Sequence, residues 1–320
     1  MTFRQAWLRG PGPTTLPQAL LLAAKGFCMG VADIIPGVSG GTIAFITGIY
    51  ADLLAAIRSV NARCLASLVR LRPLDALGEV HLRFLAPLLL GLGAALVGMA
   101  GLMHHLLTTH PVQIWALFLG LIAASVLVVG REVGRWDART LGALALGAVA
   151  AWIITGLIPV STPEAPWFLF LCGVVAICAM ILPGISGSFL LLILGKYEYV
   201  TAALRNPLEP GNLLVLLVFG CGCAVGIAGF SRLLSWLLAR WHAPVVALLT
   251  GFMAGAARKV WPWKEPLETV VVRGDVHVLR EALVLPRGLD AATFWALGLM
   301  AAGFAAVLLL DAAAARARGK

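Results

Sequence analysis

The sequence is poor in charged residues. Asp, Glu, Lys and Arg make up 12% of its 320 residues, against about 25% in a typical soluble domain. Apolar residues reach 61%, which is more than the core of a soluble domain of this size holds. The long apolar runs also lack the strict alternation that marks outer-membrane β-strands. The composition therefore excludes an ordinary soluble protein and predicts an all-α integral membrane protein.

Cysteine, histidine and acidic residues are also scarce. Five of the six cysteines fall within apolar segments, where Cys behaves as a small hydrophobe, so we expect no disulfide, metal site or other cofactor. The 15 Asp and Glu are outnumbered by 24 Lys and Arg, giving a net charge of +9. In a membrane protein this excess is typical of basic cytoplasmic loops and does not indicate nucleic-acid binding. Binding of an anionic ligand is a second explanation for the excess of positive charge.

Ten apolar segments have the length and composition of membrane helices. Most connections between them are short, and the two long ones cover residues 58–83 and 258–290. The segments span residues 19–35, 42–57, 84–103, 112–130, 140–158, 167–182, 188–204, 212–238, 243–257 and 291–311.

A Pro-Gly-x-Ser-Gly motif occurs twice, close to half the chain apart. The two copies are Pro36-Gly37-Val38-Ser39-Gly40 and Pro183-Gly184-Ile185-Ser186-Gly187. A Gly-x-Tyr sequence follows each copy at the same distance and ends at Tyr50 and at Tyr197. A match of this extent predicts an internal duplication, with one repeat over residues 1–160 and the other over residues 161–320.

Each half contains five apolar segments, and an odd number makes the second half enter the membrane from the opposite side. The sequence therefore predicts inverted repeats. The arms around each motif are shorter than the roughly 20 residues of a full span, and Pro and Gly break the helix between them. We expect two re-entrant helical hairpins, over residues 19–57 and 167–204, that meet near the bilayer midplane.

Basic residues predict which ends lie in the cytoplasm. Arg4 and Arg9, the basic loop 58–83 and the basic C-terminus all favour cytoplasmic termini. Loop 258–290 conflicts with this scheme, because the number of crossings places it outside although it is rich in Lys and Arg. Its Val-rich stretch over residues 269–285 alternates in part, which predicts a β-hairpin.

The two turns have the chemistry of an anion site. Pro ends one helix, and Ser39 or Ser186 is expected to cap the next. A helix N-terminus offers free N–H groups and a positive dipole end, glycines allow close approach, and hydroxyl groups add donors. The alternative is a structural turn in which Ser only caps the helix; two inverted copies favour a ligand site. The candidate binding residues at the turns are Ser39, Gly40, Gly41, Thr42, Ser186, Gly187 and Ser188.

Ionisable residues lie near both turns. Lys25 and Asp33 precede the first, and Lys196 and Glu198 flank Tyr197 after the second. Charges within membrane segments are candidates for function: the two lysines and the two tyrosines for binding the ligand, the two acids for proton coupling. Lys25 has the alternative of extending to the membrane surface. For Lys196, Glu198 and the tyrosines, the alternative is the membrane interface.

These motifs resemble the PopT-type polyprenyl-phosphate translocases, a bacterial membrane family first catalogued as a domain of unknown function. The resemblance implies a flippase that recycles undecaprenyl phosphate, the lipid carrier of cell-wall precursors, across the cytoplasmic membrane. Its partners would be that lipid and the bilayer, and a homo-oligomer remains open. The matching residues are Lys25-Gly26, Gly30 to Thr42, Gly48-Ile49-Tyr50, Pro183 to Ser188, and Gly195 to Glu198.

Two other functions remain open at this point. Undecaprenyl-diphosphate phosphatases of the BacA type have a similar Pro-Gly-x-Ser-Arg-Ser motif, but Gly40 and Gly187 stand where the Arg would be. Phosphoryl transfer needs cationic charge on the transferred group and an activated nucleophile, so we expect no catalysis. A transporter of small anions could use the same helix ends, and only an opening toward lipid would distinguish it from a lipid translocase.

Overall fold

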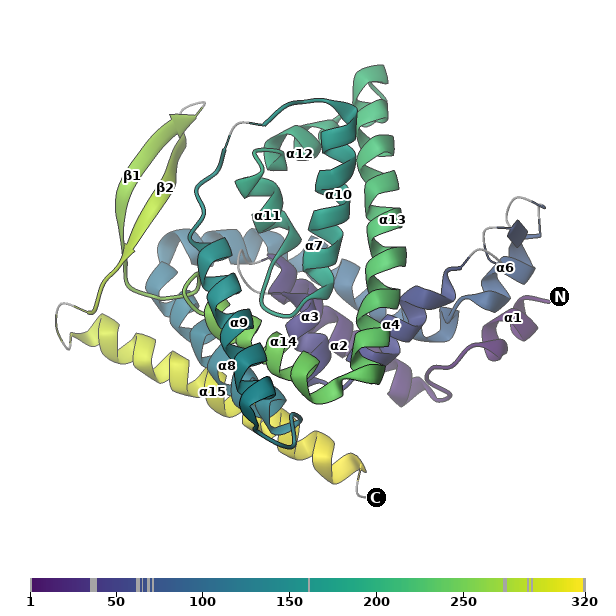
Figure 1. Cartoon of the computed structure of the whole chain (residues 1–320), viewed down its shortest axis with the longest axis horizontal. Coiled ribbons are helices and arrows are strands. Elements are labelled where there is room, and N and C mark those ends of the chain that lie inside the picture. Colours follow the sequence, from purple (N-terminus) through teal and green to yellow (C-terminus); the bar gives the residue numbers. More distant parts are fainter. Residues whose placement is uncertain are drawn as a thin grey trace.

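The chain folds into a helical assembly with one two-stranded hairpin on its side (Figure 1). The computed structural model describes residues 2–34, 39–61, 64, 66–67, 70, 72–160, 162–272, 275–286, 288 and 290–318. Residues 35–38, which include Pro36 and Gly37 of the first motif, lie outside the described part. The helices that match the ten predicted segments form the body of the molecule.

The elements follow one another with short connections. In the first half they are α1 (Phe3–Arg9), α2 (Leu16–Ile34), α3 (Gly40–Ile46), α4 (Tyr50–Ser59), α6 (Pro73–Glu79), α7 (Leu82–Thr109), α8 (Pro111–Arg131) and α9 (Ala138–Thr155). In the second half they are α10 (Pro166–Ile181), α11 (Gly187–Ile193), α12 (Tyr197–Arg205), α13 (Pro210–Arg240), α14 (His242–Ala256), β1 (Lys264–Val272), β2 (Asp275–Leu283) and α15 (Ala291–Arg318).

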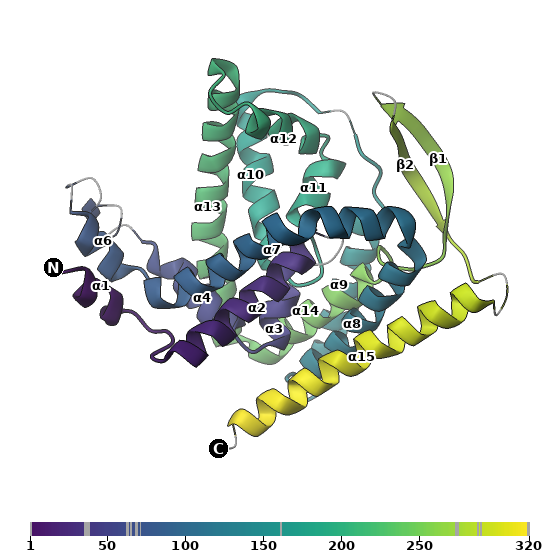
Figure 2. The same ribbon diagram turned by 180° about the vertical axis from the view of Figure 1, so that it is seen from behind.

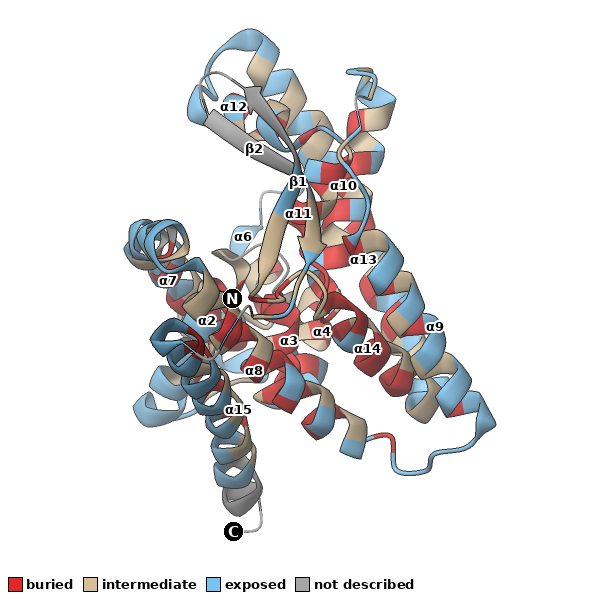
Figure 3. Cartoon of the chain, turned by 90° about the vertical axis from the view of Figure 1, so that its left-hand side faces the viewer, coloured by how far each residue is buried: buried red, intermediate tan, exposed pale blue. Residues whose placement is uncertain are grey.

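Five of these helices are long and apolar enough to cross a membrane, and the number rises to seven if each bent pair counts as one span. The five are α7, α8, α9, α13 and α15. Their outward faces carry exposed aliphatic side chains, such as Leu90 on α7 (73% exposed) and Leu309 on α15 (70% exposed). Figure 3 shows the buried residues gathered around α3 and α14. Exposed apolar surface of this extent is what a lipid-facing helix requires.

Two of the predicted segments are broken, which corrects the prediction of continuous helices over 42–57 and 188–204. The chain bends by 120° between α3 and α4 and by 113° between α11 and α12. At each bend a glycine has positive φ, 71° at Gly48 and 63° at Gly195. Side chains other than Gly rarely adopt this conformation. The Gly-x-Tyr sequence is therefore the signal of a sharp bend, which the unbroken apolar composition conceals.

The long helices pack in four close pairs: α2 with α7, α10 with α13, α8 with α15, and α9 with α14. Glycines sit where the backbones touch, so that a Cβ atom at Gly91 would meet the carbonyl of Ala23, and one at Gly222 that of Phe170. The first two pairs each lie within one half of the chain, and the contact of α2 with α7 in the first half corresponds to that of α10 with α13 in the second. The other two join the halves, because α15 packs on α8 and α9 packs on α14, as the view from behind shows for α15 and α8 (Figure 2).

The predicted β-hairpin is confirmed, with strands that begin earlier than expected. Strands β1 and β2 are antiparallel, and Lys264 pairs with Leu283 at the open end of the hairpin. This end lies beside the end of α14, where the Trp261 indole donates to the carbonyl of Val284 over 2.8 Å. The hairpin thus stands on the ends of the helices and extends away from them (Figure 1).

Candidate functional site

Residues of the first motif bind directly to the backbone of the second turn. The buried Ser39 hydroxyl lies 3.2 Å from the carbonyl oxygen of Leu182. The hydroxyl of Thr42 accepts a hydrogen bond from the backbone N–H of Gly184 over 3.0 Å. The Tyr50 phenol, itself buried, donates to the carbonyl of Ile181 over 3.0 Å. The start of α3 and the end of α10 therefore come together, as expected for two motifs that share one site.

Glycine is required where these backbones touch. A Cβ atom built on Gly41 would lie 2.9 Å from the carbonyl oxygen of Ile181, which is closer than such contacts occur. Gly184 has φ of 92°, and a Cβ atom there would lie 2.8 Å from the Cα of Met253 on α14. Close packing, against Ile181 at Gly41 and against α14 at Gly184, thus explains the glycine at these two positions.

Asp33 binds the start of α3. Its Oδ1 atom accepts a hydrogen bond from the N–H of Gly40 over 2.7 Å, while the Ser39 hydroxyl accepts from the N–H of Gly41 over 3.1 Å. A Cβ atom on Gly40 would lie 2.6 Å from Oδ2 of Asp33. A carboxylate of the protein thus occupies the first free N–H of this helix, the place that suits a negative group.

The second turn has a different arrangement. Ser186 precedes α11 but caps no backbone N–H, so the expectation that it caps the helix was wrong. Its hydroxyl instead pairs with that of Ser188, with 2.7 Å between the oxygens. Gly187 packs against α10, where a Cβ atom would meet the carbonyl of Ala176. Because two hydroxyls that bind each other are not tied to the backbone, they are free to turn toward a ligand.

The two lysines each bind a backbone carbonyl near the end of a short helix. Nζ of Lys25 donates to the carbonyl of Thr47, the residue that caps the C-terminus of α3, over 2.8 Å. Nζ of the buried Lys196 donates to the carbonyl of Thr162 over 2.9 Å, and the Thr162 hydroxyl in turn donates to Leu194 at the end of α11 over 2.5 Å. Cations are favourable at the negative C-terminal end of a helix. Both lysines therefore stabilise the bends.

Tyr197 and Glu198 do not reach the turns. Both are exposed on α12, and in the described part of the chain neither side chain has a hydrogen bond to the motif residues. The ring that approaches Lys196 is that of Tyr199, at 5.4 Å. In this structure both residues thus lie apart from the turns, and the roles of Tyr197 in ligand binding and of Glu198 in proton coupling stay predictions. The structure corrects the alternative of an interfacial Tyr50, which is buried.

A cluster of cations lies beside α11 and was not predicted from the sequence. Lys259 and Lys264 both approach the carboxylate of Glu281, at 3.6 Å and 3.4 Å. The Lys259 ammonium lies 5.3 Å from the ring centre of Phe189, the residue after Ser188, and that of Lys264 lies 4.4 Å from the ring centre of Trp115. The conflict over loop 258–290 thus has a physical reason, since part of its positive charge is folded against the helices. The charge conflict in the sequence was the signal for this cluster.

Burial changes the acidity of this cluster. Desolvation lowers the pKa of Lys264 from 10.5 to about 8, with a further lowering by Lys259, while Glu281 raises it. The desolvated ammonium thus loses its proton as the pH rises through about 8, well below the pH at which a lysine in water loses it.

Comparisons with known proteins identify the family to which the chain belongs. The model of the VCA0040-like, undecaprenyl phosphate translocase-like family matches residues 29–276, which include both turns. The chain belongs to this family. A protein of Vibrio cholerae named polyprenyl-phosphate transporter is 44% identical over 76% of this chain and 78% of its own length. One of the same name from Staphylococcus aureus is 31% identical over 74% of this chain and 84% of its own length. No solved structure matches the chain.

Family membership and the apolar helices together make this a multi-pass membrane protein. The predicted resemblance is confirmed by the family model and by both relatives.

Proposed function

We propose that this protein is a non-enzymatic lipid transporter that moves polyprenyl phosphate between the leaflets of the bacterial cytoplasmic membrane. The observation that carries the proposal is the direct contact between the two Pro-Gly-x-Ser-Gly turns, in a family of undecaprenyl phosphate translocase-like proteins. Both named relatives transport a polyprenyl phosphate according to their names. Undecaprenyl phosphate is the substrate that the sequence resemblance favours, and its recycling would serve cell-envelope synthesis.

The two halves form inverted repeats in this proposal. The sharp bends at equivalent glycines and the matching helix crossings of α2 with α7 and α10 with α13 support a duplication. The odd number of apolar segments in each half supports opposite orientations. Each repeat then begins with a re-entrant hairpin around its turn, and rocking of one repeat against the other exposes the turns to each face in alternation. Both chain termini lie in the cytoplasm.

The substrate's phosphate binds between the turns in place of internal partners. In this structure the N–H of Gly40 is bound to Asp33, and the hydroxyls of Ser39 and Thr42 are bound to the second turn. These internal bonds hold the two turns against each other. As the turns separate, the phosphate oxygens take over these donors together with the hydroxyls of Ser186 and Ser188.

The energetic purpose of such a site is to lower the barrier for a charged headgroup. A single charge at the bilayer centre costs about 3 kcal/mol to more than 10 kcal/mol, depending on the method. Hydrogen bonds to a charged group each contribute about 1.5–3 kcal/mol, so four or five of them offset much of that penalty. The prenyl chain remains in the lipid throughout.

Asp33 couples the movement to protons in this proposal. While Asp33 is ionised, it holds the N–H of Gly40 and repels a phosphate. Once it is protonated, the N–H is released and the phosphate is no longer repelled. One proton would then accompany each phosphate. Glu198 has no part in this step, because it lies exposed on α12.

Phosphatase chemistry is not supported. Gly40 and Gly187 replace the arginine that the phosphatase motif carries, and the groups near the first turn are a carboxylate and hydroxyls bound to backbone. Transfer of a phosphoryl group without a cation on its oxygens lacks the main source of stabilisation.

The proposal is tested by leaflet-specific detection of a fluorescent polyprenyl phosphate in vesicles that contain the purified protein. We expect transport by the wild type, a large loss with Ser39→Ala and a smaller loss with Ser186→Ala. Thr155→Val is the matched control, because its buried hydroxyl binds only carbonyls of its own helix, α9. Transport that is the same in all variants and in empty vesicles would overturn the proposal.

A further inference from the structure

Tryptophans mark one end of the helical assembly. Trp115 lies near the start of α8, Trp152 near the end of α9, Trp261 just after α14, and Trp295 near the start of α15. Trp side chains concentrate at the level of the lipid headgroups. The number of crossings, and the lack of Lys and Arg in the connections 104–111 and 159–166, predict that this end lies on the outer face of the membrane together with loop 258–290. A lipid in the outer leaflet has its headgroup at this level.

A cavity of about 340 Å³ opens at this level, between α8, α9, α14 and the open end of the hairpin. Its walls are mostly apolar and include Leu119, Trp152, Trp261 and Leu285. Leu285 is 76% exposed and Trp152 is 49% exposed, so the apolar lining continues onto the lipid-facing surface. A cavity of this size suits a small ligand or the first units of a lipid chain.

One guanidinium lies at the wall of this cavity. Arg258 donates from Nη1 to the carbonyl of Trp152 over 3.1 Å, and its guanidinium stacks 4.8 Å from the ring centre of the same Trp. Gly156 leaves the room that the guanidinium occupies, since a Cβ atom there would collide with Arg258 Nη1. The position of the guanidinium is thus fixed on both sides. Among the described residues its other N–H groups have no hydrogen-bond acceptor, and a guanidinium carries five N–H donors.

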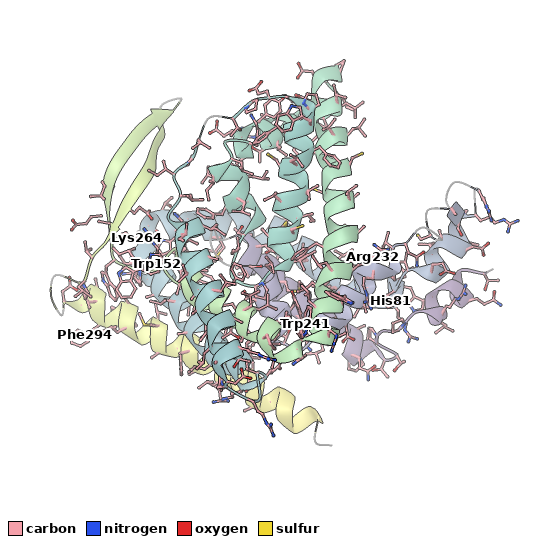
Figure 4. The ribbon with its side chains drawn as sticks, in the orientation of Figure 1. His81, Trp152, Arg232, Trp241, Lys264 and Phe294 are labelled. Carbon is pink, nitrogen blue, oxygen red and sulfur yellow. The ribbon has the colours of Figure 1, made fainter. Side chains whose placement is uncertain are left out.

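The positive charge continues from the cavity toward the second turn. Lys259 follows Arg258 directly, Lys264 donates to the carbonyl of Lys259 over 2.7 Å, and both lysines share the carboxylate of Glu281. Three cations around one shared carboxylate leave an excess of positive charge next to apolar walls. Figure 4 labels Lys264 and Trp152 near the base of the hairpin.

We infer that this cavity is a loading site for a lipid phosphate monoester of the outer leaflet. The phosphate binds Arg258 and the neighbouring Lys259, and the first prenyl units lie against Trp152, Leu119 and Leu285. The inference rests on the proposed function and adds to it a second binding place, separate from the paired turns. Neither a free phosphate nor an uncharged prenyl alcohol satisfies both the cations and the apolar walls.

The position of Lys259 connects this site with the turns. Its ammonium lies over the ring of Phe189, and Phe189 follows Ser188 on α11. A phosphate that leaves Arg258 therefore stays on Lys259, which lies against the residue that follows Ser188 of the second turn. Lipid phosphates would load at the cavity before the turns open.

The test uses geranylgeranyl phosphate with a photoreactive group near its headgroup, bound to the full-length protein in nanodiscs. We expect cross-links to the cavity walls, with unlabelled geranylgeranyl phosphate competing far better than inorganic phosphate or geranylgeraniol. Arg258→Gln should weaken binding about tenfold or more, since it removes a hydrogen bond to a charged group. Arg232→Gln is the matched control, because the exposed Arg232 guanidinium also binds a backbone carbonyl, that of Ala228, but on α13.

A second variant tests the contribution of the prenyl chain to binding separately from that of the phosphate. Ala254 is exposed and lines the cavity, so Ala254→Phe should fill it and weaken binding of geranylgeranyl phosphate while Arg258 remains in place. Cross-links only to other regions, no cross-links at all, or unchanged binding in both Arg258→Gln and Ala254→Phe would overturn the inference. Wild-type transport that persists in vesicles alongside any of these results would leave the proposed function intact, so that the two failures are distinguishable.

Discussion

The two serines of the paired turns should differ in their effect on stability. Ser39 is 1% exposed, caps the N–H of Gly41 and bonds to the carbonyl of Leu182. Ser39→Ala removes a helix cap worth about 1 kcal/mol and leaves the carbonyl of Leu182 without this donor, which costs a further 1–3 kcal/mol or so. We expect a loss of about 2–4 kcal/mol in the free energy of unfolding. Ser186→Ala removes only the bond to the hydroxyl of Ser188, which is worth about 0.5–1.5 kcal/mol.

The assay is unfolding of the purified protein in mixed micelles, with the fraction of denaturing detergent as the variable. Both substitutions remove one oxygen, so the change in volume is the same and the difference reports the bonds alone. Ser39→Ala should unfold at a clearly lower fraction of denaturing detergent than Ser186→Ala. Equal losses, or a larger loss for Ser186→Ala, would refute the assignment of Ser39 as the residue that ties the two turns together.

Three further predictions concern charge and backbone. Binding of geranylgeranyl phosphate should weaken as the pH rises through about 8. Burial lowers the pKa of Lys264 to about 8, so Lys264 is charged below that pH and neutral above it. Lys264→Arg should abolish this dependence of binding on pH. Asp33→Asn keeps an oxygen for the N–H of Gly40 but removes the ionisable group, so a pH gradient should no longer drive transport; a variant that follows the pH gradient as the wild type does would end the coupling hypothesis. Gly41→Ala should reduce transport strongly, because its Cβ atom would collide with the carbonyl of Ile181. Gly48→Ala has open space around it and should cost only about 1–2 kcal/mol of stability for its positive φ. A larger loss of transport with Gly48→Ala than with Gly41→Ala would contradict this.

Much of the fold follows from local pattern. Apart from α6, which falls in the predicted connection 58–83, the helices from α2 to α15 lie where apolar runs predict them. The β-hairpin follows from the alternation of Val between α14 and α15. The bends at Gly48 and Gly195 were missed because the sequence on both sides stays apolar, and only the φ angle of the glycine reveals a break. Composition predicts that a segment is a helix but not where a glycine within it leaves the helical conformation.

The site was harder to predict because it depends on which helices pack together. Tyr50 and Tyr197 occupy the same place in the repeated motif, yet Tyr50 is buried and Tyr197 is 41% exposed. The reason is that Tyr50 bonds to the carbonyl of Ile181 in the other half and packs against the ring of Phe45, whereas Tyr197 lies on the exposed face of α12. A repeated sequence predicts repeated local structure, but the surroundings of each copy are set by contacts across the chain.

The basic cluster shows the same limit. Arg258, Lys259 and Lys264 look in the sequence like charges of a solvated loop, and the charge rule then contradicts the parity of the spans. In the structure a ring or a carboxylate lies against each of them. Sequence alone predicts how much charge a segment carries, but not that the fold places this charge at an apolar cavity.

The central claim is that the protein moves polyprenyl phosphate between leaflets without changing it chemically. It is tested most directly by following a labelled polyprenyl phosphate in vesicles with the wild-type protein, measuring both the leaflet it occupies and any release of inorganic phosphate. The account predicts that the lipid equilibrates between leaflets much faster than in empty vesicles, with no phosphate released. Equilibration at the rate of empty vesicles, or release of phosphate from the lipid, would contradict it.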